Sequence, residues 1–79
     1  MNPILVVLMS YVMYAEECPN NLSADANRVW NQTIDNAGRA KIMGYVEYVR
    51  SKRDGPVDCA KIERELQEGY DGARPFSKP

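Results

Sequence analysis

Residues 3–15 form an apolar block, PILVVLMSYVMYA, that contains no charged residue. A stretch that is apolar on every side forms the centre of a core, a membrane segment or a signal sequence. Thirteen residues followed directly by Glu16 and Glu17 are too short for a membrane span, which needs roughly 20. The block also lacks the positive flank of a signal sequence. We therefore expect a buried core element and no membrane.

The same block is predicted to be a helix. Asn2 is a suitable N-cap, Pro3 stands at the favoured first position, and Pro19 follows as a stop. The alternative is a strand over residues 4–14, because β-branched and aromatic residues are frequent there. A lone strand would need a partner, which two copies in a homodimer could supply.

Apolar residues recur at helical spacing over residues 24–37. Ser23 or Asp25 can cap this helix, Trp30 is expected to anchor the core, and Gly38 marks the end. The apolar stripe consists of Ala26, Val29, Trp30, Thr33, Ile34 and Ala37.

Two more helices are predicted further along the chain. Residues 39–53 carry a new stripe whose phase differs by ~140° from the previous one, so Gly38 separates two helices or bends one. The turn Arg53–Pro56 precedes a last helix, which Asp58 caps and which ends within Gly69–Gly72. The stripes are Ile42, Tyr45, Val46 and Val49, and then Cys59, Ile62, Leu66 and Tyr70.

These elements predict an all-α protein, a small bundle of three or four short helices around the apolar N-terminal segment. We expect one domain over residues 1–79, with 72–79 as a flexible tail. The alternative is a small α+β fold in which residues 4–14 are a strand.

Composition argues against an enzyme. The chain has 79 residues, 44% of them hydrophobic and 27% charged, with a net charge of −1 and no histidine. The usual general base and the usual zinc ligand are therefore missing. No Ser-His-Asp arrangement and no glycine-rich phosphate loop is present. We expect no catalytic residues, no metal and no cofactor.

Cys18 and Cys59 are the two cysteines, and they have no histidine partners for a metal site. We favour the interpretation that they are small buried apolar residues. In an exported protein they would form a disulfide, and in a cytosol Cys59 at a helix N-terminus could be a reactive thiol.

Charge is concentrated in the middle of the chain. Residues 39–53 hold five basic residues and one acidic residue, a net of +4, between acidic flanks. On a helical wheel Lys41, Tyr48 and Lys52 fall within an arc of ~60°, and Arg53 directly follows Lys52 at the end of the basic segment. Tyrosine and arginine are typical anchors of protein interfaces. The candidate partner-binding residues are Lys41, Tyr45, Tyr48, Arg50, Lys52 and Arg53, together with Glu63, Glu65 and Glu68 on the outer faces of the last helix.

The first functional hypothesis is a cytoplasmic protein-binding module, regulator or inhibitor, for example of the phage type that blocks a host complex. The second is a secreted, disulfide-linked glycoprotein domain with a cleaved N-terminal leader; the two N-x-S/T sequons begin at Asn21 and Asn31. The third is a nucleic-acid binder that uses the basic helix 39–53, which the acidic flanks oppose. A homodimer would help a small core to become complete.

Overall fold

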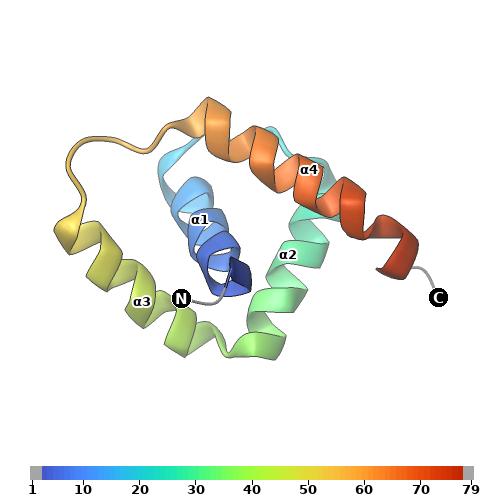
Figure 1. Cartoon of the computed structure of the whole chain (residues 1–79), viewed down its shortest axis with the longest axis horizontal. Coiled ribbons are helices and arrows are strands. Elements are labelled where there is room, and N and C mark those ends of the chain that lie inside the picture. The colour runs from blue at the N-terminus through green and yellow to red at the C-terminus, as the bar shows by residue number, and fades with distance from the viewer. Residues whose placement is uncertain (1–2, 78–79) are drawn as a thin grey trace.

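The computed structural model describes residues 3–77, and the side chains of residues 3–72. It confirms an all-α fold, with no strand among the described residues. Helix α2 and helix α3 have the predicted bounds to within one residue. The four helices, labelled in Figure 1, are α1 (Pro3–Glu17), α2 (Ala24–Ala37), α3 (Arg39–Lys52) and α4 (Cys59–Ser77).

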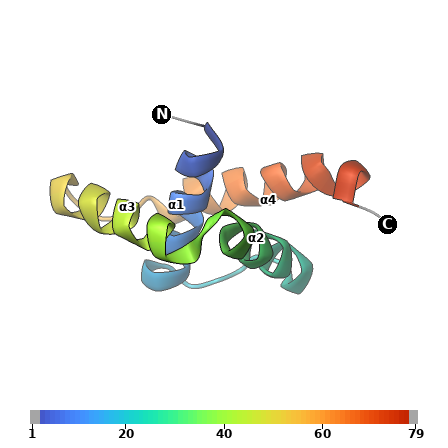
Figure 2. The ribbon, with the colours of Figure 1, turned by 90° about the horizontal axis from the view of Figure 1, so that it is seen from below.

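Helix α1 is the centre of the fold, as the apolar block predicts. Helices α2, α3 and α4 form an open layer around it, and its first turns stand out from one side of that layer (Figures 1 and 2). None of the helices within residues 3–77 combines the length and the apolar character needed to span a membrane. The buried residues of α1 are Leu8, Met9, Tyr11, Val12, Met13 and Tyr14.

Because residues 3–17 are helical, the strand alternative is wrong. The pairing of two N-terminal strands in a homodimer loses its basis for the same reason. Burial around most of its circumference explains why α1 can be helical despite its β-branched residues, since packing outweighs weak intrinsic preference.

Local signals define the ends of α2. The Ser23 side chain accepts a hydrogen bond from the Ala26 N–H at 3.1 Å, which confirms the predicted cap. Gly38 ends the helix with a φ of +106°, a conformation that favours glycine, and its N–H donates to the Ile34 carbonyl at 3.0 Å. The chain then starts α3 in a new direction.

The surrounding helices each turn a few apolar residues towards α1. Ile34 from α2, Ile42 and Val46 from α3, and Leu66 from α4 are at most 1% exposed. These residues belong to the predicted stripes. The core therefore forms where four elements meet, and each contributes a narrow apolar face.

Helix α4 begins as predicted but extends further. The Asp58 carboxylate accepts a hydrogen bond from the Lys61 N–H at 3.1 Å, so Asp58 caps the helix. The helix passes through Gly69 and Gly72 and ends at Ser77. Glycine inside a helix costs only about 1 kcal/mol, which the packing of Tyr70 can offset. Of the predicted tail 72–79, residues 72–77 are helical and 78–79 lie outside the described residues.

A disulfide bond joins Cys18 to Cys59, with 5.8 Å between the two Cα atoms. The favoured interpretation of two separate buried thiols is therefore wrong, and so is a reactive Cys59 thiol. The bond forms because Cys18 directly follows α1 and Cys59 begins α4, and these two ends meet. It ties the start of α4 to the end of the central helix α1.

Candidate functional site

The basic segment divides into an inner and an outer part. Arg50 is inner: its guanidinium lies 2.5 Å from a Glu16 oxygen and 3.3 Å from a Glu17 oxygen. Arg53 is also inner, with a distance of 2.8 Å to Glu17. Both arginines therefore connect the end of α3 to the end of α1, and their charge is largely neutralised.

Arg53 does not share a helical face with Lys41 and Lys52. Helix α3 ends at Lys52, and Arg53 has extended backbone angles, φ −79° and ψ 138°. Its guanidinium donates to the Gly55 carbonyl at 2.9 Å and contacts the Met13 sulfur at 3.6 Å. Arg53 can turn back towards α1 because the chain has already left the helix.

These ion pairs change the acidity of Glu17. The hydrogen bond from Arg53 lowers the pKa of the Glu17 carboxyl, and the charges of Arg53 and Arg50 add to this effect. Partial burial opposes it but does not cancel it. Glu17 is therefore held in its charged form at the junction of α1 and α3.

The outer part of the basic segment consists of Lys41, Tyr45, Tyr48 and Lys52, which we call the outer α3 face. Tyr48 is 66% exposed, and the Lys52 ammonium lies 5.8 Å from the centre of its ring. Tyr45 is 37% exposed. Lys41 and Lys52 form no ion pair with a described residue. Four of the six basic-segment candidates thus share one exposed surface.

The acidic candidates of α4 also divide. Glu63 is turned inwards, where it accepts a hydrogen bond of 2.8 Å from the buried Tyr14 hydroxyl. Burial raises the pKa of Tyr14, and the Glu63 carboxylate adds to the increase. Glu65 and Glu68 are exposed and have no ion-pair or hydrogen-bond partner among the described residues. Helices α3 and α4 do not pack against each other over residues 3–77, so the structure does not combine the outer basic and acidic residues into one surface.

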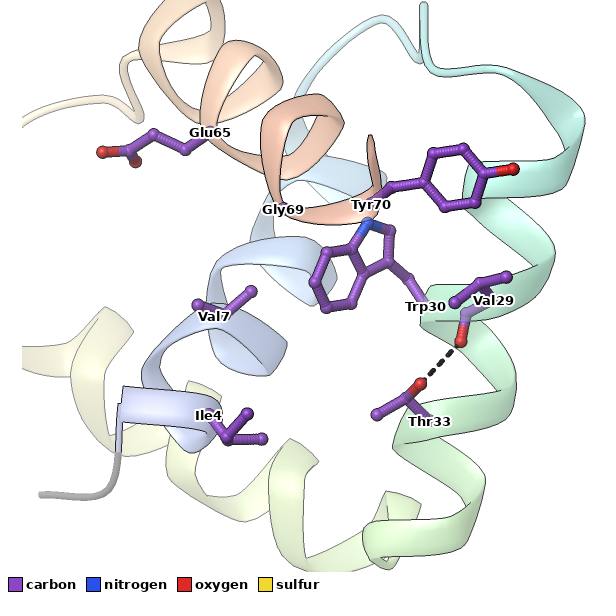
Figure 3. Close-up of a pocket in the computed structure, with 8 residues that line it drawn as sticks. All are labelled: Ile4, Val7, Val29, Trp30, Thr33, Glu65, Gly69 and Tyr70. Atoms are coloured by element: carbon purple, nitrogen blue, oxygen red, sulfur yellow. Dashed lines mark hydrogen bonds between the residues drawn. The ribbon is translucent and has the colours of Figure 1, made fainter. Parts of the chain in front are cut away.

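A cavity that the sequence did not indicate lies between the first turns of α1 and helices α2 and α4 (Figure 3). Its volume is about 380 Å³. One wall is the indole ring of Trp30, and Ile4 and Val7 face it from α1. The lining residues are Ile4, Val7, Val29, Trp30, Thr33, Glu65, Gly69 and Tyr70.

The polar groups of the cavity wall already have partners. The Trp30 indole N–H donates to the Leu66 carbonyl at 3.2 Å, and the Thr33 hydroxyl donates to the Val29 carbonyl at 2.8 Å. The Tyr70 hydroxyl bonds to Asp25. The inner surface therefore presents apolar groups, and among side chains 3–72 Glu65 is the one charged member of the lining.

Trp30 both anchors the core and lines the cavity. Its ring stacks on Tyr11 with 6.5 Å between ring centres, which bears out the predicted core role in part. The one sequence signal for the cavity is an excess of apolar residues at the start of α1. Ile4 is 61% exposed and Val6 is 47% exposed, so α1 carries more apolar surface than the core covers.

Comparison with protein families, with curated proteins and with solved structures finds no match for this chain. Function must therefore be inferred from the outer α3 face, from the cavity and from the disulfide. The outer α3 face consists of four of the partner-binding residues that the sequence predicts.

Proposed function

We propose that this protein is a non-enzymatic protein-binding module, a regulator or inhibitor, that contacts its partner through the outer α3 face. The observation that carries the proposal is the exposure of Tyr48 beneath Lys52. A large aromatic ring held in solvent beside a cation has no role in packing this fold. Tyrosine in such a position is typical of interface anchors.

The chemistry of the face suggests the partner's surface. Lys41 and Lys52 are cations without a carboxylate partner among residues 3–77, whereas Arg50 and Arg53 are neutralised by α1. The partner should therefore offer carboxylates around an apolar spot that receives the Tyr48 ring. Such complementarity mainly increases the association rate and the specificity.

The disulfide supports action in an oxidising compartment, because disulfides persist mainly there. This favours the secreted alternative over a cytoplasmic one. Helix α1 belongs to the folded module in either case, because it supplies six of the buried core residues. Of the two sequons, Asn21 is exposed, whereas the Asn31 amide donates to the Tyr11 hydroxyl at 2.9 Å.

Nucleic-acid binding is less well supported. Its strength depends on the number of phosphates neutralised by lysine and arginine. Arg39 is paired with Asp35 at 2.6 Å, and Arg50 and Arg53 are paired with α1. Lys41 and Lys52 alone on this helix would give weak binding with only a shallow dependence on salt. A salt series with a DNA duplex would measure this directly.

The proposal is tested with the double variant Tyr48→Ala, Lys52→Glu. Affinity capture from the native source, read by mass spectrometry, should show a partner that the wild type retains and this variant loses. A control variant, Gln32→Ala with Lys61→Glu, also truncates one exposed side chain to alanine and reverses one lysine charge, at exposed positions of α2 and α4. Equal capture by both variants would refute the outer α3 face as the interface.

A further inference from the structure

The cavity beside Trp30 has the properties of a binding site for a small molecule. We infer that it binds a compact apolar molecule whose polar end is a cation, such as an aromatic or aliphatic ammonium compound. This inference is independent of the outer α3 face, which shares no residue with the cavity.

Size and polarity of the cavity argue for an apolar body. Its volume of about 380 Å³ lies in the lower part of the ~300–1,000 Å³ range of small-molecule pockets. Trp30 gives a flat aromatic wall, and Ile4 and Val7 form the opposite side (Figure 3). The hydrogen-bonding groups of Trp30 and Thr33 are used within the protein, so the interior has no donor left for a polar ligand.

The absence of a side chain at Gly69 keeps the cavity open. A Cβ atom at this position would lie 3.2 Å from the Trp30 ring, which is tighter than nine in ten contacts of this kind. Helix α4 can therefore approach the flat ring closely while the indole remains a wall of the cavity. Trp30 is thus packed closely against Gly69 of α4, whereas the cavity separates it from Ile4 and Val7 of α1.

The negative charge of Glu65 at the edge of the cavity determines which charge is favoured at the polar end of the ligand. Glu65 rises from α4 at the opening, and its carboxylate is directed outwards, away from the Trp30 ring (Figure 3). It has no ion-pair or hydrogen-bond partner among the described residues, and the described residues that line the cavity include no lysine or arginine. A ligand with its apolar body inside would place its other end near Glu65, which attracts a cation and repels an anion.

The test uses three probes with the same apolar body: 4-phenylbutylammonium, 4-phenylbutanol and 4-phenylbutyrate. Trp30 is the single tryptophan of the chain, so its fluorescence reports binding in the cavity. We expect saturable binding of the ammonium probe, about fivefold tighter than that of the carboxylate probe, as one exposed ion pair allows. The alcohol should lie between them.

Two variants locate the site. Glu65→Gln should remove the preference for the ammonium probe and retain binding of the alcohol, whereas Glu68→Gln, which does not line the cavity, should change neither. Thr33→Phe should fill the cavity and abolish binding of all three probes. If its circular dichroism shows lost helix, Thr33→Leu serves the same purpose with a smaller side chain. Absence of saturation, equal affinity for ammonium and carboxylate, or unchanged binding after filling would overturn the inference.

Discussion

The hydroxyl of Tyr14 donates a hydrogen bond of 2.8 Å to a carboxylate oxygen of Glu63, which connects the last turn of α1 to α4. The same hydroxyl accepts a hydrogen bond from the Asn21 N–H at 2.9 Å. Tyr14 is fully buried, and its one phenol group pairs with both a donor and an acceptor at the edge of the core. This contact fixes the loop after α1 as well as the position of α4.

Tyr14→Phe should therefore lower the free energy of unfolding by about 1–3 kcal/mol, because it leaves the Asn21 N–H and the Glu63 carboxylate without the phenol. Urea denaturation followed by circular dichroism would measure this. Tyr48→Phe removes an exposed hydroxyl and should change stability by less than about 0.5 kcal/mol. Equal effects of the two substitutions would contradict the role given to Tyr14.

Removal of the disulfide with Cys18→Ala and Cys59→Ala should lower the free energy of unfolding by about 3–4 kcal/mol. The bond closes a loop between residues 41 positions apart and so lowers the conformational entropy of the unfolded chain. Without the bond, the unfolded chain regains this entropy and becomes more favourable. In a protein with a thin core this is a large part of the total. An unchanged urea midpoint would show that the bond does not constrain the unfolded chain as expected.

Gly69 and Gly44 should respond differently to alanine. A Cβ atom at Gly44 meets no other atom within 4 Å, so Gly44→Ala should stabilise α3 by about 0.5–1 kcal/mol through helix propensity. At Gly69 the new Cβ would press on Trp30, and the gain should be cancelled or reversed. Thermal unfolding of both variants gives the comparison; equal stabilisation would disprove the close packing of Gly69 on Trp30.

Acid should weaken the junction of α1 and α3. Because Arg53 lowers the pKa of Glu17 in the folded state, the stability from this pair is present above the unfolded pKa of about 4.3 and is lost as the pH falls through the folded value. Urea midpoints measured from about pH 6 to about pH 3 should fall less steeply for Glu17→Gln than for the wild type. Parallel profiles would show that Glu17 has the same pKa in both states.

Local signals in the sequence were sufficient to predict the helices. Ser23, Gly38 and Asp58 mark helix ends through bonds within a few residues, and the structure contains those bonds. The predicted end of α4, within Gly69–Gly72, is too early because it rests on the low helix propensity of glycine alone. Its close approach to Trp30 depends on two helices that are far apart in the sequence.

The outer α3 face and the cavity were harder to predict because they depend on contacts between residues far apart in the sequence. Arg50 and Arg53 are neutralised by acids of α1 that are 34 and 36 positions away, so no local pattern separates them from Lys52. The cavity depends on the angle at which α1 crosses the layer of the other helices. The exposed ends of Tyr48 and Lys52, by contrast, follow from their places on one helix, and these were predicted.

The proposed interface is tested most directly by site-specific photo-crosslinking. A photoreactive phenylalanine analogue at position 48 should crosslink to one partner protein in the native source. The same analogue at position 32, exposed on α2, should not. Adding Lys41→Glu and Lys52→Glu to the chain labelled at position 48 should greatly reduce the crosslinked product. Equal crosslinking from both positions, or a product unaffected by the charge reversals, would contradict binding through the outer α3 face.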